Sequence, residues 1–355
     1  YYVDKTGFIS ELLNYTDKVQ LITRPRRFGK TLMMSMLKCF FDIEQDNRVL
    51  FSGLEIGRNK VLCAEWMNQC PVVFLTFKEI EGLDFESAYD CLKDVLAEIF
   101  NQYSFILDAD NVNDYDRKLF TNLQNGMASK MEVKKSLKLL TRLLYAHYNK
   151  QVIILLDEYD VPLAKAHERG YYEEMLDLMR GMLQVLKDND CLNFAVLTGC
   201  LRVSKESVFT GVNNFSTSSI ISKNFNRYFG FTEKEVENLC IEYGMSIEET
   251  KAWYNGYGLY SHNKQEDILY SIYNPKSVVE AMLRHRFGNY WNQTETYEAL
   301  KIYIQMNMDG LKDAIIEMLA GNSVRINIGT FHNDMTTFAT RDDILTLLVH
   351  LGYLT

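Results

Sequence analysis

A short apolar run leads straight into a basic loop near the start of the chain. Val19–Thr23 has the composition of a buried strand, and the loop that follows reads Arg24-Pro25-Arg26-Arg27-Phe28-Gly29-Lys30-Thr31. Leu32–Phe41 has the pattern of an amphipathic helix. A strand, a tight loop ending in Gly-Lys-Thr and a helix form a phosphate-binding arrangement, because the loop and the helix N-terminus present backbone N–H groups. This order predicts an α/β fold with a P-loop.

The end of the loop carries the residue types that phosphate binding needs. We expect Lys30 to reach the β- and γ-phosphates and the Thr31 hydroxyl to ligate Mg²⁺. The usual first glycine of the motif is missing, because Arg24 occupies its position. The residues predicted to contact the nucleotide are Arg24, Pro25, Arg26, Arg27, Phe28, Gly29, Lys30, Thr31, Leu32 and Pro275. On its own, a Gly-Lys-Thr sequence is more often an ordinary helix start.

A second motif supplies the carboxylates. Gln151–Leu156 is an apolar run that suits a strand buried on both faces of a parallel sheet, and Asp157 and Glu158 follow it. Ligands of open α/β sheets bind at the edge where such strands end. We expect Asp157 to hold Mg²⁺ and Glu158 to polarise the attacking water. The alternative is a buried strand that ends in a solvated acidic turn; the two motifs together favour an ATP- and Mg²⁺-binding NTPase.

A third apolar run, Cys191–Thr198, ends near two further candidates. Thr198 is suited to positioning water, although it can equally be a plain strand-end hydroxyl. Arg202 follows three residues after Gly199 and is predicted to sense the γ-phosphate. Its alternative is a surface arginine that pairs with the carboxylates.

The loop concentrates positive charge in an acidic chain. The net charge is −9, yet Arg24, Arg26, Arg27 and Lys30 lie within one short loop. Such a cluster is costly unless anions neutralise it, so we expect Arg26 or Arg27 to face phosphate or the acidic pair. The alternative is an exposed basic loop that docks DNA or an acidic partner.

The length of 355 residues predicts more than one domain. We expect a P-loop ATPase core over residues 1–231 with a helical insertion at about 84–148, a helical lid over 232–320, and a partial winged helix over 321–355. Residues 224–231 are a candidate for the last short strand of the core. In the lid, a further helix is expected at 295–304. Pro275 and the aromatic turn Trp253–Gly258 are candidates to line an adenine; packing between domains is the alternative.

The composition indicates the compartment and the kinds of partner to expect. The seven cysteines include no C-x-x-C pair, which is typical of reduced thiols in a cytoplasmic protein. No apolar run reaches the length of a membrane span, and the net charge argues against a general nucleic-acid-coating surface. The chain ends directly after an apolar helix, so we expect it to be part of a longer protein. Expected partners are a nucleotide and a protein partner or the chain's own effector domain, with DNA reached through another region; the oligomeric state stays open.

These motifs resemble those of the bacterial AAA-ATPase-like family, which is grouped with the STAND ATPases. The matching segments, in order, are Tyr2–Thr6, Arg24–Thr31, Leu156–Asp160, Thr198-Gly199, Leu201-Arg202, Asn213-Asn214, Phe229–Thr232, Tyr254–Tyr257 and Tyr273–Pro275. The resemblance implies a parallel five-stranded P-loop core, an all-α lid and a winged helix, often fused to a PD-(D/E)XK nuclease domain. Arginine in place of the first loop glycine is the family's own form, but Lys276 stands where an aromatic residue is usual.

The sequence therefore predicts an Mg²⁺-dependent, slowly hydrolysing ATPase that acts as a conformational switch. Two alternatives stay open: a nucleotide-gated interaction module without significant turnover, and an ATPase module that serves a DNA-processing nuclease.

Overall fold

The computed structural model describes residues 2–109, 112–201, 208–209, 215–222, 224–262, 267–290, 308, 310–328, 331 and 340–354. The chain divides into two compact units. The first unit comprises Tyr1–Ile22 and Lys30–Thr217, and the second comprises Thr23–Gly29 and Ser218–Thr355. The expected boundary lay near Phe231, and the phosphate loop was expected to belong wholly to the core.

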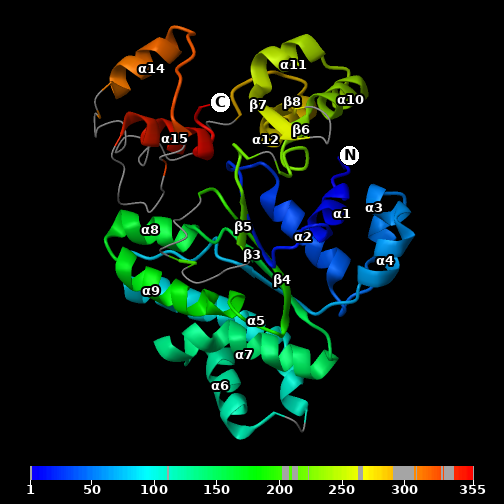
Figure 1. Cartoon of the computed structure of the whole chain (residues 1–355), viewed down its shortest axis with the longest axis vertical. Coiled ribbons are helices and arrows are strands. Elements are labelled where there is room, and N and C mark those ends of the chain that lie inside the picture. Colours follow the sequence, from blue (N-terminus) through cyan, green and yellow to red (C-terminus); the bar gives the residue numbers. More distant parts are fainter. Residues whose placement is uncertain are drawn as a thin grey trace. The chain divides into compact units, whose positions relative to one another are not determined.

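A parallel five-stranded sheet with helices on both faces organises the first unit, which confirms the predicted α/β class (Figure 1). The strand order is β2-β3-β4-β1-β5. The strands are β1 (Val19–Thr23), β2 (Val72–Thr76), β3 (Val152–Asp157), β4 (Leu192–Gly199) and β5 (Phe215–Ser218). Every residue of β1 and β3 is buried, as the continuous apolar runs predicted.

Helices cover the sheet on either side. One face carries α1 (Gly7–Leu13) and α2 (Lys30–Phe41), and α5 (Phe85–Gln102), α7 (Lys130–Tyr148) and α9 (Tyr172–Met182) lie on the other (Figure 1). The remaining helices of this unit are α3 (Glu55–Arg58), α4 (Lys60–Trp66), α6 (Asp114–Gln124) and α8 (Val161–Arg169), with 3-10 turns at Arg48–Phe51, Ser104–Asp108 and Leu183–Leu186. The stretch expected to be a helical insertion thus contains α5, α6 and α7. Ser129 and Glu132 form a capping box that fixes the start of α7.

The second unit combines helices with a small antiparallel sheet. Its strands β6 (Phe231–Thr232), β7 (Asn255–His262) and β8 (Asp267–Tyr273) pair in the order β6-β8-β7. Its helices are α10 (Glu233–Tyr243), α11 (Ile247–Tyr254), α12 (Pro275–Arg284), α14 (Leu311–Leu319) and α15 (Arg341–Leu351). The expectation of an all-α lid over 232–320 is therefore wrong. The expected aromatic turn Trp253–Gly258 is divided: Trp253 and Tyr254 end α11, and the residues from Asn255 on begin the β7–β8 hairpin, whose aromatic and β-branched side chains suit strands.

Three further expectations need correction or stay open. Residues 224–230 form turns, so the fifth strand of the large sheet is β5 and not the predicted strand at 224–231. The expected helix at 295–304 lies outside the described residues. The winged helix stays a prediction, because 332–339 also lies outside them and 352–354 is not a strand.

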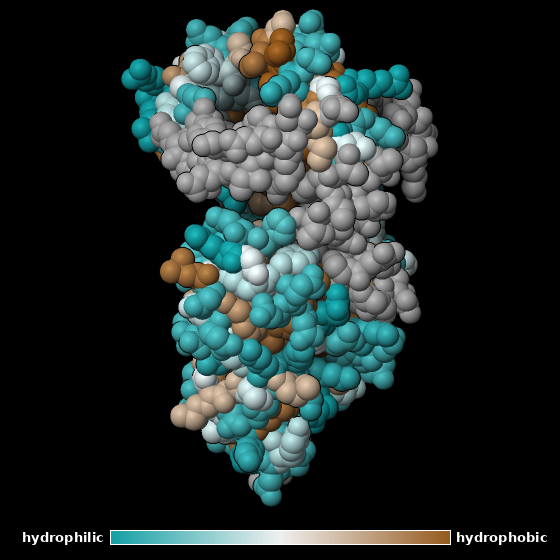
Figure 2. Space-filling model, turned by 90° about the vertical axis from the view of Figure 1, so that its left-hand side faces the viewer, coloured by the Kyte–Doolittle hydropathy of each residue, from teal (hydrophilic) through white to brown (hydrophobic). Residues whose placement is uncertain are grey.

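The coloured surface in Figure 2 is mostly hydrophilic, and its apolar side chains are scattered. Among the described residues, no helix has both the length and the apolar character that a membrane crossing demands.

Candidate functional site

The strand order of the large sheet brings the two core motifs together. β4 lies between β1, which precedes the loop, and β3, which ends at Asp157. Parallel strands end at the same edge, and α2 begins at Lys30 beside that edge. Thr31 Oγ donates a hydrogen bond to Asp157 Oδ2 at 2.7 Å, and Thr198 Oγ donates to Asp157 Oδ1 at 2.5 Å. The Asp157 carboxylate, only 1% exposed, is thus held between two hydroxyl groups from α2 and β4.

Lys30 is buried in the first unit, beside a carboxylate and a sulfur atom. Its Nζ is 3.6 Å from Glu158 Oε1 and donates to Cys200 Sγ at 3.4 Å. Burial lowers the pKa of Lys30, but Cys200, Glu158 and Asp160 raise it, and the net result is a raised pKa. The ammonium group therefore stays charged although the side chain is buried.

Glu158 occupies an unusual backbone position. Its φ is +53°, in the left-handed region that side chains other than glycine rarely adopt. Such strain persists only where the surroundings hold it, and it clusters at functional sites. The Glu158 side chain is 19% exposed, whereas the Asp157 carboxylate is sealed in. Of the two acidic residues, Glu158 is the one that solvent reaches.

Asp160 is a site residue to which the sequence assigned no role. Its Oδ2 accepts hydrogen bonds from the backbone N–H groups of Cys200 at 2.9 Å and Leu201 at 2.7 Å. Burial, followed by the charge of Glu158, raises the pKa of Asp160 to about 6. Its Oδ1 is buried without a hydrogen-bond partner among the described residues. The signal was present in the Asp-Glu-Tyr-Asp sequence, but only the fold shows that Asp160 holds the turn after β4.

Tyr159 completes the link between the ends of β3 and β4. Its backbone N–H donates to Thr198 O at 2.9 Å, and its hydroxyl donates to Leu201 O at 2.8 Å. Gly199 permits this approach, because a Cβ there would lie 2.3 Å from Asp160 Oδ1. The turn that carries Cys200 to Lys30 is therefore fixed by the residues just after Glu158.

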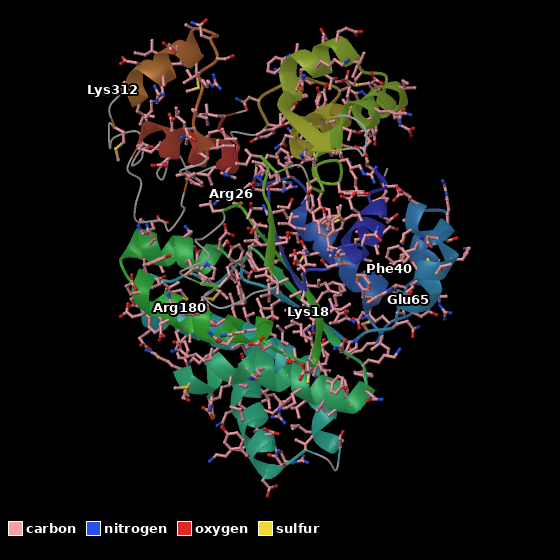
Figure 3. All side chains as sticks on the ribbon, in the orientation of Figure 1. Lys18, Arg26, Phe40, Glu65, Arg180 and Lys312 are labelled. Carbon is pink, nitrogen blue, oxygen red and sulfur yellow. The ribbon has the colours of Figure 1, made fainter. Side chains whose placement is uncertain are left out.

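Residues 24–29 of the loop belong to the second unit, and their side chains differ in how deeply they are buried. Arg24 is fully buried, and its guanidinium group donates to backbone and side-chain oxygens of Ser218 and to Asn224 O. The expectation that the Arg24 side chain contacts the nucleotide does not fit this enclosure. Arg26, labelled in Figure 3, is exposed. Arg27 is half-buried with φ +68°, and its Nη1 is buried without a hydrogen-bond partner in the part of the chain that the structure describes.

The other predicted contacts belong to both units. Pro25 and Phe28 are buried, and Gly29 has φ +83° with open space where a Cβ would stand. Leu32 is 63% exposed on the first turn of α2. Pro275 opens α12 in the second unit, where the Asn274 side chain caps the helix. Arg202 lies outside the described residues.

The donors around Asp157 fit Mg²⁺. A protein binds this ion through one or two oxygen ligands and leaves the remaining positions to phosphate and water. Thr31 Oγ and Asp157 Oδ2, which share a hydrogen bond, are oxygen ligands of this kind. No cluster of three or more His, Cys, Asp or Glu side chains suited to a metal occurs among the described residues. Thr31 and Asp157 are therefore the residues that would hold the ion.

Comparisons with known proteins agree with this geometry. Residues 1–209 match the model of the AAA-ATPase-like family, described as a predicted AAA-ATPase. The chain is also 29% identical over 300 residues to an "uncharacterized protein in vnfD 5′ region" of Azotobacter chroococcum mcd 1. That match covers 83% of this chain and 51% of the relative, so the chain spans about half the length of this curated relative. Since the family model covers more than half of its residues, the chain belongs to the predicted AAA-ATPases.

Proposed function

We propose that this chain is an Mg²⁺-dependent ATP-binding module that hydrolyses ATP slowly and acts as a conformational switch. The observation that carries the proposal is the 2.7 Å hydrogen bond between Thr31 Oγ and Asp157 Oδ2. It joins the last residue of the phosphate-loop motif to the carboxylate that ends a buried strand. A structural hydroxyl–carboxylate pair alone would not need a buried lysine and a second acid beside it, and both are present.

Each residue has a proposed task. Thr31 and Asp157 hold Mg²⁺, which when bound neutralises charge on the phosphate oxygens. Lys30 contacts the β- and γ-phosphates, and Arg27 satisfies its buried N–H on a phosphate oxygen. Thr198 orients the Asp157 carboxylate through its hydrogen bond, and its water-positioning role stays a prediction.

Glu158 is the proposed general base. In this structure its carboxylate faces the Lys30 ammonium. A phosphate group beside Lys30 competes for the same charge, which frees Glu158 to polarise water. This competition links hydrolysis to binding within one pair of side chains.

A binding module without significant turnover is the second candidate. The Lys30–Glu158 ion pair favours it, because a base that stays paired with lysine polarises water poorly. Phosphate release measured at saturating ATP separates the two. Turnover that disappears in Glu158→Gln supports the ATPase, and no turnover in the unaltered chain supports the binding module.

Calorimetric titration of the chain with ATP, ADP and GTP, with and without Mg²⁺, tests the proposal. We expect ATP to bind more tightly with Mg²⁺ than without it. Absence of binding to all three nucleotides would refute the proposal. The same titrations test Arg202 as a γ-phosphate sensor, because Arg202→Ala should then weaken ATP more than ADP. The downstream partner, whether a protein, an effector domain or a DNA-processing nuclease, is a separate proposal.

A further inference from the structure

The start of the phosphate loop is fixed by the Arg24 side chain. This guanidinium group is 0% exposed. Its Nη1 donates to Thr23 O at 2.9 Å and to Ser218 O at 2.8 Å. Its Nη2 donates to Ser218 Oγ at 3.1 Å and to Asn224 O at 3.0 Å. One side chain thus ties the residue after β1 to the end of β5 and to the turns that follow it.

Further neutral groups line this enclosure. Asn226 Oδ1 lies 3.4 Å from Nη2, and the ring of Phe229 lies 5.0 Å from the guanidinium carbon. Ser218 Oγ also donates to Asn224 O at 2.8 Å, so the acceptors hold one another in place. Burial lowers the pKa of Arg24 to about 9, and the group remains charged at neutral pH. Its planar fork reaches several acceptors at once, which a lysine cannot reproduce.

The end of the loop is fixed by Phe28. Its ring is 2% exposed and packs in one cluster with Ile220, Tyr257 and Ile272. It meets Tyr257 edge to face, with ring centroids 5.6 Å apart. The Gly230 N–H donates to Phe28 O at 3.3 Å, and a Cβ on Gly230 would lie 3.2 Å from the Phe28 ring.

From Arg24 to Gly29 the backbone makes turns that need support. Arg27 has φ +68° and Gly29 has φ +83°. A glycine at position 24 would supply flexibility; this chain has two buried side chains instead. We propose that Arg24 and Phe28 are positioning residues that hold the phosphate loop in its binding conformation. The inference rests on the proposed function only for its effect on ATP, because loop order can be measured without nucleotide.

The test combines ATP titration with limited trypsin digestion of the chain. Arg24→Ala should lower ATP affinity about tenfold, because the loop must then be ordered by the ligand. The ATP affinity of Arg24→Lys should be close to that of Arg24→Ala, because lysine lacks the planar, forked set of donors of a guanidinium group. Asn226→Ala should cause a smaller loss, and adding it to Arg24→Ala should cause no further loss. Without nucleotide, trypsin should cut faster after Arg26 and Arg27 in all these variants.

Arg117→Ala is the matched control. Arg117 also holds a loop by donating to the backbone carbonyls of Leu107, Ala109 and Val112. We expect it to leave ATP affinity and cleavage after Arg26 and Arg27 unchanged. If Arg24→Ala does not fold, Asn226→Ala and Phe28→Leu apply the same test from either end of the loop.

Two results would overturn the inference. One is unaltered tryptic cleavage of the loop in the anchor variants. The other is a loss of ATP affinity in the anchor variants no larger than that of Arg117→Ala, while Lys30→Ala still lowers ATP affinity roughly tenfold or more. If the unaltered chain binds no ATP, the proposed function fails, and the cleavage rates still decide whether the anchors order the loop.

Discussion

The Lys30 ammonium is shared between a carboxylate and a thiol, so its removal and that of its acidic partner should have different effects. Lys30→Ala deletes a charge-assisted phosphate contact, a loss of about 1.5–3 kcal/mol or roughly tenfold to a hundredfold in ATP affinity. Glu158→Gln keeps the shape and removes the charge, so ATP should still bind while phosphate release falls sharply. Lys134→Ala removes another ion-paired lysine, bound to Asp177, and serves as the control. Equal loss of ATP binding in the Lys30 and Glu158 variants would contradict these roles.

Adjacent arginines in the loop provide an internal comparison. Arg27 has a buried N–H that no described group accepts, whereas Arg26 is exposed. An unsatisfied buried donor is costly, and a phosphate oxygen would remove that cost. Arg27→Ala should therefore weaken ATP binding about tenfold, and Arg26→Ala should change it little. Calorimetry on both variants checks this, and the reverse ranking would move the phosphate contact to Arg26.

Asp160 should make stability depend on pH. Its pKa is raised from 3.8 to about 6, so the folded chain binds this proton more tightly than the unfolded chain does. The stabilising contribution is fully present below about pH 4 and is lost as pH rises through 6, a change of about 3 kcal/mol. Asp160→Asn cannot titrate there. Its free energy of unfolding in urea, minus that of the unaltered chain, should rise between pH 4 and 7; a constant difference would show an ordinary pKa.

At the scale of elements, the ends of β3 and β4 depend on one glycine. A Cβ at Gly199 would lie 2.3 Å from Asp160 Oδ1 and 2.9 Å from the Tyr159 ring. Gly199→Ala must push these groups apart, and overpacking of this kind costs about 1–3 kcal/mol. Gly288→Ala is the control, because its nearest neighbour would be 3.3 Å away. Urea unfolding of both variants measures the difference, and equal stability would mean that the strand ends are not tightly coupled.

Whether a helix or strand could be predicted depends on how clear its hydrophobic pattern is in the sequence. Continuous apolar runs revealed β1, β3 and β4, and the expected helical insertion contains α5 and α7, because burial imposes apolar patterns directly on the sequence. β5 reads Phe-Ser-Thr-Ser and carries little apolar signal; only its place in the sheet makes it a strand. β7 was missed because a helix precedes it and two glycines interrupt its alternation. β8 was missed with it, because the segment was expected to belong to an all-α lid.

The residues of the candidate site likewise divide into those that the sequence predicts and those that only the fold reveals. Lys30, Thr31 and Asp157 could be proposed from local motifs, because the chemistry requires those residue types at the ends of those elements. The contacts of Asp160 and Arg24 could not. Arg24 meets Ser218 across 194 positions and Asp160 meets Cys200 across 40, and no local pattern specifies partners at such separations.

At the scale of the whole molecule, charge decides which partners the chain can attract. The net charge is −9, and the visible surface in Figure 2 is hydrophilic without a large apolar area in its coloured part. Duplex DNA attracts proteins mainly through phosphate neutralisation by Lys and Arg, so an acidic chain should be repelled. The basic loop does not reverse this, because Arg24 is enclosed and Arg27 is half-buried.

We therefore expect no saturable binding of this chain to labelled duplex DNA in fluorescence anisotropy at about 0.15 M salt. Adding ATP and Mg²⁺ should not create it, since the bound triphosphate adds negative charge at the loop. Binding that weakens steeply with salt and is lost in Arg26→Ala would contradict this expectation. The exposed part of the loop at Arg26 would then be a DNA-docking surface, and nucleotide and DNA would compete for the loop.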